Sequence, residues 1–396
     1  MKRIIVNKRI LKIAIVVAVE ILLGIILLCV HSHAKGRKEV LYSQQAAARF
    51  SVDNEAWAQI SIFYTEDMGL GSTDINNIRS EVQKKLYDDS LLERPKDSGA
   101  SSDARTWYDA YSGHTFDDVR KDSTSVHVNV YTVGGDFFLI HNIPLLGGSY
   151  LDMNSTDVNQ ILIDEYVANV LFGSSNAAGM KLWIGDAVYT VTGVVACDDF
   201  KAADDAYGEY YSVYVPMEAY SKTRSIGAAK NNNSSEDSKG DDISSGGNSE
   251  GTVATCYEMV LPNPIKNYGL NTVAEAADIK FMTDEEKEAA RSSLNFGDRE
   301  IIDNTARFKV SSLYDRMKMQ GYESLRTNAI VYPYWENEAR FEEAHQIKLM
   351  RFCTLLISVM LLILLISAVV IFIHIRKKVI HIFMQKKSGK YGYNMN

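Results

Sequence analysis

The sequence predicts an α+β fold: a mixed α/β core domain outside the cytoplasm, carried on two helical stalks and flanked by two transmembrane helices. Three observations lead to this prediction. A long apolar run lies near each end of the 396-residue chain, and basic residues cluster on the terminal side of each run. Strand and helix signals alternate between the runs, over a length that can bury a sizeable core.

Charge is distributed unevenly along the chain. The two terminal flanks contain 11 basic residues and no acidic one: Lys2, Arg3, Lys8, Arg9, Lys12, Arg376, Lys377, Lys378, Lys386, Lys387 and Lys390. Glu20 aside, the chain between them has 31 basic and 49 acidic residues, a net charge of −18. Basic flanks stay on the cytoplasmic side, so both termini are expected there and the acidic middle outside. An acidic surface repels nucleic acid, so no nucleic-acid partner is expected.

The first apolar run, residues 13–30, predicts a transmembrane helix despite its one charge. Thirteen of its residues are Leu, Ile or Val, each favouring insertion by roughly 0.3–0.6 kcal/mol, against about 2.5–3.5 kcal/mol for a central charge. The charge, Glu20, either contacts a partner helix within the membrane or is tolerated in protonated form. A cleaved signal peptide is the rival interpretation, because Ser32-His33-Ala34 resembles a cleavage site, but the run exceeds the usual 7–15 residues or so.

The second run, residues 352–373, has 22 uncharged residues and is long enough to cross a bilayer. The expected stalks are helical extensions of the two membrane helices, at Arg37–Phe50 and Trp335–Ile347, both free of Gly and Pro. The predicted organisation is a basic tail (1–12), a transmembrane helix (13–30), an external core domain with its stalks (31–351), a second transmembrane helix (352–375) and a second basic tail (376–396).

Within the core domain, strands and helices are expected to alternate. Alternating or β-branched runs predict strands at 56–64, 126–131, 160–163, 182–184, 188–195, 210–215 and 253–261. Apolar residues at helical spacing, with capping residues before them, predict helices at 72–86, 164–171, 283–293 and 310–319. Residues 222–251 are mostly Ser, Asn, Gly, Asp and Lys, so a disordered loop is expected there.

Motifs for catalysis or for cofactors are weak. The segment 173–181 resembles a phosphate-binding loop, but five residues separate its glycines and Leu182 stands where a hydroxyl is needed. His31 and His33 lack partners at metal-ligand spacing, and the acidic doublets lack the ladder of a calcium loop. The sequence therefore predicts no catalytic residue, no metal and no cofactor, and the chain is not expected to be an enzyme.

Four cysteines are present, and two of them fall in the expected external region. Cys197 and Cys256 could form a disulfide there, whereas two unpaired buried thiols are the alternative. Cys29 and Cys353 lie in or beside the apolar runs.

Five short segments between residues 126 and 195 follow one another in a recognisable order. They are 131–138, with two adjacent aromatic residues; 143–150; 161–168 together with 171–173; 179–182; and 189–195. The residues of these segments that make up the pattern are Phe137, Phe138, Pro144, Gly147, Gly148, Phe172, Gly173, Gly179 and Gly193. In this order and spacing they resemble the MacB-like periplasmic core domain of FtsX-like and MacB-like ABC transporter permeases. The resemblance covers about 70 residues, with Gly148-Ser149 replacing the usual Gly-Arg, and marks a fold rather than a catalytic site.

The resemblance implies a permease-like subunit or accessory of a MacB- or FtsX-type ABC system, which transmits ATP-driven motion to an extracytoplasmic domain for export or mechanotransmission. A separate ABC ATPase subunit, the lipid bilayer and a fuller permease subunit are the implied partners. The last is expected because such permeases have three membrane helices after the core domain, whereas one follows here. The alternative is a bitopic membrane sensor or scaffold that retains the core fold without transport.

Overall fold

The computed structural model describes residues 8–39, 41–51, 55–92, 106–155, 158–197, 211–224, 253–279, 294–295, 298–319 and 329–391. Two compact units make up the chain. We call Glu39–Glu343 the core domain, and Met1–Lys38 with Ala344–Asn396 the helix pair.

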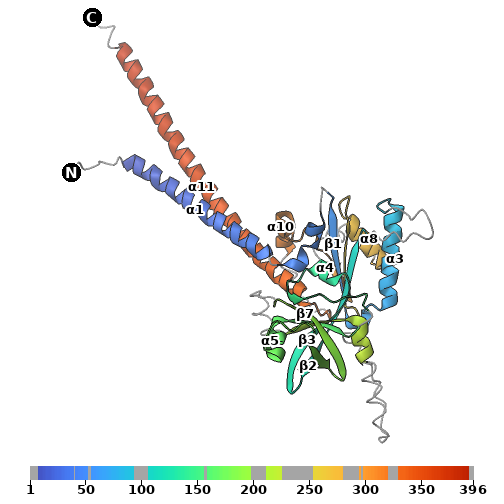
Figure 1. Ribbon diagram of the computed structural model, residues 1–396. Coiled ribbons are helices and arrows are strands. Elements are labelled where there is room, and N and C mark those ends of the chain that lie inside the picture. Colours follow the sequence, from blue (N-terminus) through green and yellow to red (C-terminus); the bar gives the residue numbers. More distant parts are fainter. Residues whose placement is uncertain are drawn as a thin grey trace, which may run out of the picture. The chain divides into compact units, whose positions relative to one another are not determined.

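Strands of the core domain belong to one connected sheet (Figure 1). They are β1 (Trp57–Tyr64), β2 (Tyr108–Lys121), β3 (Thr124–Gly135), β4 (Leu145–Gly148), β5 (Gln160–Asp164), β6 (Lys181–Ile184), β7 (Ala187–Val195), β8 (Ser212–Pro216), β9 (Cys256–Pro262), β10 (Leu294–Asn295) and β11 (Arg299–Asp303). The order along the sheet is β10-β11-β1-β9-β2-β3-β8-β5-β7-β4. The pairs β3–β8 and β5–β7 are parallel and the others antiparallel, so the α+β class is confirmed.

Half of this sheet closes on itself. Strand β6 pairs with both β7 and β2, which completes a circuit of β2, β3, β8, β5, β7 and β6. Val130, Ile163, Tyr189 and Val213 are among the fully buried residues that fill its interior. Closure removes the unpaired edge that β6 would otherwise present.

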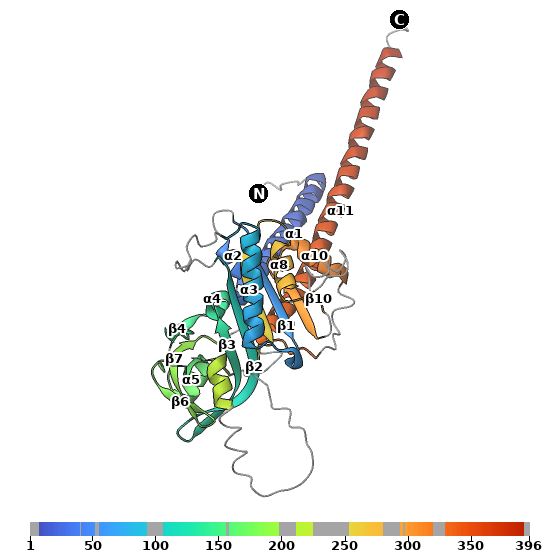
Figure 2. The same cartoon turned by 90° about the vertical axis from the view of Figure 1, so that its right-hand side faces the viewer.

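The other half is an open sheet covered by two helices. Helices α3 (Ser72–Asp88) and α8 (Tyr268–Ala276) lie side by side over β1 and β9 (Figure 2). Ile75, Ile78, Val82 and Leu86 of α3 are all buried, as their helical spacing predicts. The first turn of α3 is closed by Asp74, whose carboxylate accepts a hydrogen bond from Gly71 N–H at 2.9 Å.

Besides the long helix α1 (Lys8–Glu39), the remaining elements are short helices and one further long one. They are η1 (Tyr42–Gln44), α2 (Ala46–Phe50), η2 (Glu66–Met68), α4 (Phe137–His141), α5 (Glu165–Phe172), a helix over residues 217–224, α10 (Val310–Met319) and α11 (Tyr334–Tyr391). The expected helix at 283–293 and most of the expected disordered loop at 222–251 lie outside the described residues.

The first stalk differs from the prediction. Helix α1 (Lys8–Glu39) ends where the core domain begins, so Arg37–Phe50 is not one continuous helix. Leu41, Ala46 and Ala47 are buried in the core domain, and Gln59 holds the turn by accepting from Ala46 N–H at 3.0 Å and donating to the Ser43 carbonyl at 2.6 Å. The helix stops because these apolar residues gain more by packing than by extending into water.

The second stalk is helical, but its first turns are part of the core domain. Tyr334–Glu343 opens α11, and Trp335, Glu336 and Glu342 have side chains that are almost wholly buried. The composition of this segment predicted a stalk exposed to solvent, because four acids and an arginine normally face water. Pairing within the protein explains the burial and is described below.

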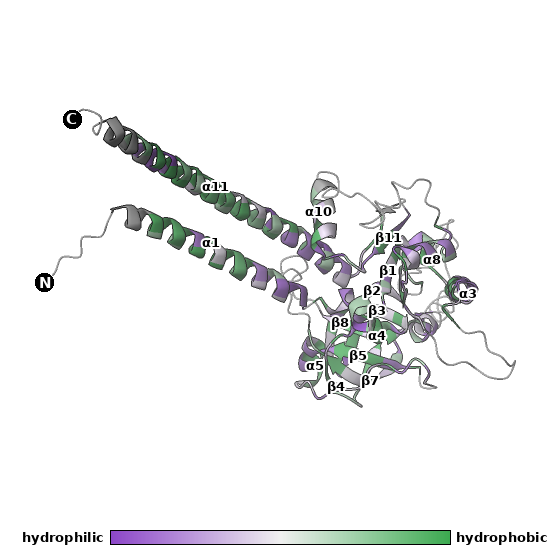
Figure 3. Cartoon of the chain, turned by 90° about the horizontal axis from the view of Figure 1, so that it is seen from above, coloured by the Kyte–Doolittle hydropathy of each residue, from purple (hydrophilic) through white to green (hydrophobic). Residues whose placement is uncertain are grey.

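In the helix pair, α1 and α11 are both long and apolar enough to cross a membrane, over Ile13–Glu39 and Tyr334–His381. Figure 3 shows hydrophobic residues along both helices. Leu28 and Phe372 are 68% and 66% exposed, as expected of side chains that face lipid. Gln346 Nε2 donates to the Ala34 carbonyl at 2.8 Å, which places the two helices side by side at that level.

Candidate functional site

The first turns of α11 present one polar face to the interior of the core domain. Glu336, Arg340 and Glu343 recur at i, i+4 and i+7, which places them on the same side of the helix. The helix begins directly after Pro333, whose carbonyl accepts from Glu336 N–H at 3.1 Å and from Asn337 N–H at 3.2 Å. The start of the helix after Pro333 therefore determines which of its side chains point into the core domain.

Glu336 is held by two guanidinium groups. Arg307 donates to both carboxylate oxygens, at 2.7 and 3.0 Å, and Arg340 Nε donates to Oε1 at 2.7 Å. Burial alone would raise the pKa of Glu336, but the charges of Arg307 and Arg340 outweigh it and hold that pKa below its usual value. A bidentate pair of this kind fixes orientation as well as charge.

Arg307 extends the pairing to a second acid on α11. Its Nε donates to Glu343 at 3.1 Å, and its Nη1 also donates to Asn304 Oδ1 at 3.2 Å. Although burial opposes the charge of Arg307, Glu336 and Glu343 raise its pKa. Arg307 therefore joins two turns of α11 to the segment that follows β11.

Arg340 extends the pairing to the sheet. Its Nη2 lies 3.1 Å from Glu300 of β11, an ion pair without a directed hydrogen bond, and its guanidinium stacks 4.0 Å above the Tyr332 ring. Tyr332 donates its hydroxyl hydrogen to Glu300 in turn. We call Glu300, Arg307, Glu336, Arg340 and Glu343 the charge cluster: it contains three carboxylates and two guanidiniums, all but Arg340 nearly inaccessible.

Aromatic rings enclose the same helix end from another side. The Trp335 ring lies 5.5 Å from Phe137, 4.6 Å from His141 and 5.5 Å from Tyr131, measured between centroids. Phe137 and His141 belong to α4, so the paired-aromatic helix packs directly against α11. Rings at these separations add about 0.5–1.5 kcal/mol for each pair beyond area burial.

A buried polar chain joins α4 to the charge cluster through the sheet. His141 Nε2 lies 2.7 Å from one oxygen of Glu258, a close contact without a directed hydrogen bond, and Ser61 donates to the other at 2.8 Å. Asn304 donates to Ser61 at 2.9 Å and accepts from Arg307. Side chains from α4, β9, β1 and the segment after β11 therefore form one connected path to α11.

Of the residues predicted from the sequence, Phe137 and Phe138 reach this site or its border. Both are buried, and Phe138 stacks on Tyr150 with centroids 4.9 Å apart. Pro144 is exposed, and its carbonyl accepts from Ala196 N–H at 2.9 Å. Phe172 ends α5, where Lys121 Nζ lies 4.9 Å from its ring centroid.

The predicted glycines lie in the closed half of the sheet and shape it. Gly173 caps α5 with φ 68°, and Gly179 has φ 83°. Gly148 and Gly193 permit a close approach of β4 and β7: a Cβ on Gly193 would lie 2.5 Å from the Ser149 carbonyl oxygen. Gly147 has open space around the position of a Cβ.

The other predicted sites remain separate from the charge cluster. Glu20 lies half-buried on α1 in the helix pair. Cys197 and Cys256 are unbonded, so the predicted disulfide is not observed. Burial raises the pKa of the Cys197 thiol to about 12 and that of Cys256 well above its usual value, which keeps both protonated near neutral pH.

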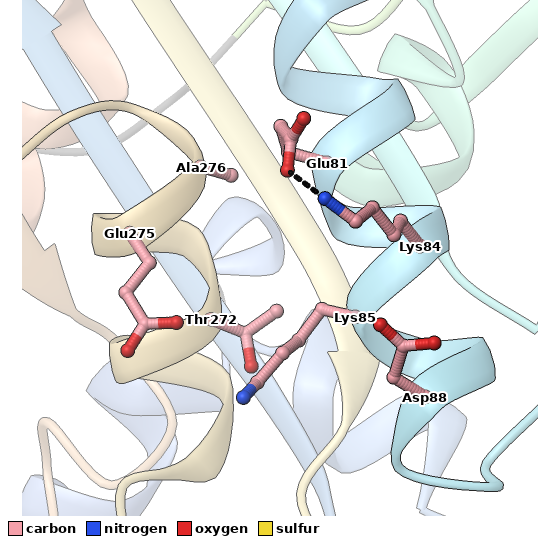
Figure 4. A pocket seen from close by; sticks show the side chains of 7 residues that line it. All are labelled: Glu81, Lys84, Lys85, Asp88, Thr272, Glu275 and Ala276. Carbon is pink, nitrogen blue, oxygen red and sulfur yellow. Dashed lines mark ion pairs between the residues drawn. The ribbon is translucent and has the colours of Figure 1, made fainter.

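A shallow pocket of about 210 Å³ lies between α3 and α8 (Figure 4). Its charged side chains are largely solvated: Glu81 and Lys84 are 59% and 68% exposed and 3.6 Å apart. Mixed charge and wide exposure favour a solvated groove over a ligand site. Among the described residues, no group of three or more His, Cys, Asp or Glu side chains could hold a metal ion.

The charge cluster was missed from the sequence. One signal was available: Glu336, Arg340 and Glu343 share a helix face beside Trp335, directly after Pro333. Arg307 and Glu300 lie 29 and 36 residues earlier than Glu336, on segments whose proximity only the fold establishes.

Comparison with known proteins gives one family match. Residues 58–241 match the family described as the MacB-like periplasmic core domain. No curated protein sequence matches the chain.

Solved structures give distant similarities. The periplasmic region of MacB from Actinobacillus actinomycetemcomitans is 13% identical, over 68% of this chain and 94% of that one, with a TM-score of 0.36. The extracellular domain of the noncanonic ABC-type transporter YknZ from Gram-positive bacteria is 12% identical, over 55% and 90%, with a TM-score of 0.33. A domain of a putative permease protein from Porphyromonas gingivalis is 11% identical, over 58% and 86%, with a TM-score of 0.30.

Proposed function

We propose, from the premise that residues 58–241 of this chain are a MacB-like periplasmic core domain, that the protein is a permease-like subunit or accessory of an ABC transporter complex. The family match is the observation that supports this function. In the proposed arrangement, both termini are cytoplasmic and the core domain lies outside the membrane. A separate ATPase subunit drives motion that the membrane helices pass to the core domain, for export or mechanotransmission.

The charge cluster supports a specific route for this motion. Helix α11 is continuous from Tyr334 to Tyr391, and its first turns are fixed to the core domain by Glu336 and its two arginines. A buried ion pair adds little net stability, but breaking one is costly, so it holds its partners in register. We assign the charge cluster the role of attachment point, at which displacement of α11 reaches β11 through Glu300 and α4 through Trp335.

The proposed function is tested by purification of the tagged full-length chain from its native membrane in mild detergent, with partners identified by mass spectrometry. We expect an ABC ATPase at a fixed stoichiometry. A matched variant, Glu336→Gln, should still bind the ATPase, because the ATPase would bind on the cytoplasmic side. The variant should lose any increase in ATP hydrolysis that assembly with the wild-type chain produces.

Recovery of the chain alone, or with signalling proteins, would contradict the transport role. That outcome would support the alternative of a bitopic sensor or scaffold. If an ATPase co-purifies but hydrolyses ATP at the same rate with wild type and with Glu336→Gln, the proposed complex is supported. The proposed role of the charge cluster in transmitting motion is then contradicted.

A further inference from the structure

Basic side chains gather in the helix pair directly beyond the two apolar runs. We call them the basic collar: Lys35, Arg37 and Lys38 of α1, and Lys348 and Arg351 of α11. The hydrogen bond from Gln346 to the Ala34 carbonyl, at 2.8 Å, brings the two segments together. No Asp or Glu occurs between Glu20 and Glu39, or after Glu343, although Glu39 of α1 lies four residues beyond Lys35.

Membrane topology does not account for the basic collar. Cytoplasmic flanks favour Lys and Arg, and external flanks usually have few. In the proposed orientation this chain has five external ones, all within eight residues of the apolar runs 13–30 and 352–373, against 11 on the cytoplasmic flanks. These five weaken the orientation signal, so topology alone does not explain their position.

Exposure along α11 indicates which interaction this is. Lys348, Arg351 and Leu355 recur at i, i+3 and i+7, and all three side chains are exposed, Leu355 by 61%. The opposite side of the helix is buried at Gln346 and Ile347. The exposed face therefore changes from basic to apolar over about 10 Å, at 1.5 Å per residue.

Helix α1 repeats the pattern at the same level. Leu28, His31 and Lys35 have the same i, i+3, i+7 spacing, and all three are exposed, Leu28 by 68%. The headgroup layer of a bilayer is roughly 5–8 Å thick on each side of its hydrocarbon core. On both helices, a basic side chain thus lies one headgroup layer beyond an exposed leucine.

We propose that the basic collar binds the phosphate groups of anionic phospholipids in the outer leaflet. The ammonium of Lys348 and the guanidinium of Arg351 would contact the headgroup phosphate while Leu355 contacts the acyl chain. Lipid is the occupant chosen over a free phosphate because the charged and apolar groups continue along one exposed face. The inference rests on the two-pass topology of the proposed function, and not on its transport role.

The test uses the full-length chain in vesicles of phosphatidylcholine with phosphatidylglycerol, a small part of it with a photoreactive headgroup. Crosslinked peptides are mapped by mass spectrometry. We expect crosslinks in residues 31–38 and 344–351, and separately in the cytoplasmic flanks. The double variant Lys348→Gln/Arg351→Gln should lower the crosslinks in 344–351 by roughly 25-fold, since each basic residue near an anionic surface contributes about fivefold.

Crosslinks in the cytoplasmic flanks are the internal control and should not change in the double variant. Lys348→Arg/Arg351→Lys should keep wild-type crosslinking, and so should Lys181→Gln, which neutralises an exposed lysine of β6. Equal crosslinking of the double variant, or equal crosslinking by a phosphatidylcholine probe, would overturn the proposal. If added inorganic phosphate abolishes the wild-type crosslinks, the choice of lipid over free phosphate is overturned. Flanks without crosslinks would instead overturn the two-pass topology.

Discussion

Glu336 is enclosed by the guanidinium groups of Arg307 and Arg340, which both donate to its carboxylate. In Glu336→Gln, Arg307 and Arg340 would share a neutral amide, with Glu343 and Glu300 as their remaining acids. Because these two acids still balance the two arginines, we expect the variant to lose the charged hydrogen bonds of Glu336, and about 1–3 kcal/mol of unfolding free energy. Chemical denaturation of the detergent-solubilised chain, followed by tryptophan fluorescence, would measure it.

The matched control is Glu81→Gln on α3. Glu81 is 59% exposed and pairs with Lys84 at 3.6 Å, so its loss should change the unfolding free energy by no more than about 0.5 kcal/mol. Equal effects of the two substitutions would show that the charge cluster does not fix α11.

Asp164 predicts a pH dependence of stability. Its carboxylate accepts from Val167 N–H at 2.7 Å and Ser212 N–H at 2.5 Å, but burial raises its pKa from 3.8 to about 6. A raised carboxyl pKa favours the protonated form in the folded state. The contribution of Asp164 to stability is therefore greatest below pH 4 and falls by about 3 kcal/mol as the pH rises to 6 and above.

Asp164→Asn should remove this slope. Denaturation midpoints of wild type and variant at pH 4.5, 5.5 and 7 measure it. The readout is the difference in slope between the two proteins, because Asn has one oxygen in place of the two that accept from Val167 and Ser212, which changes stability at every pH alike. Parallel curves for wild type and variant would refute the assignment to Asp164.

At the scale of elements, Gly193 and Gly147 form a natural pair for comparison. A methyl group on Gly193 would collide with the Ser149 and Gly147 carbonyl oxygens, at 2.5 and 2.7 Å, whereas one on Gly147 meets nothing within 4 Å. Gly193→Ala should destabilise by about 1–3 kcal/mol, and Gly147→Ala by less than about 1 kcal/mol. Thermal unfolding of both variants beside wild type measures the difference, and similar losses would contradict the observed approach of β4 and β7.

Elements with a local signal were predicted well from the sequence. Helix α10 covers Val310–Met319 as predicted, and α5 ends at Gly173 because that residue adopts φ 68°. Pro216 ends β8, and the next helix begins directly after it at residue 217. Closure of the sheet by β6 was not predicted, because Ile184 pairs with Val119, 65 residues away, and no local pattern encodes such a contact.

The candidate site was less predictable than the fold, for the same reason. Phe137 and Phe138 were identified because their pattern is contiguous in sequence. Arg307 belongs to no motif, and its importance follows from burial beside Glu336. The stalk at Arg37–Phe50 was wrong as a continuous helix because helix propensity was weighed without the burial of Ala46 and Ala47.

At the scale of the whole molecule, the proposed topology makes one accessibility prediction. Ser125 is exposed at the start of β3, and Ser388 lies in the basic C-terminal flank. In intact cells, a membrane-impermeant maleimide should label Ser125→Cys, and label Ser388→Cys only after lysis. Wild-type labelling at Cys29 and Cys353 sets the background. Labelling of Ser388→Cys in intact cells would show that the two-pass arrangement is inverted or absent.

Strand β1 is paired on both sides by strands that come much later in the chain. Its partners are β9, about 200 residues onward, and β11, which ends at Asp303. A chain that crosses the membrane from its N-terminus must therefore export some 240 residues beyond β1 before that strand has both neighbours. Closing so distant a contact is slow, and the apolar face of β1 is exposed meanwhile. In the proposed topology, β1 would therefore stay without both of its neighbours until β11 had also crossed the membrane.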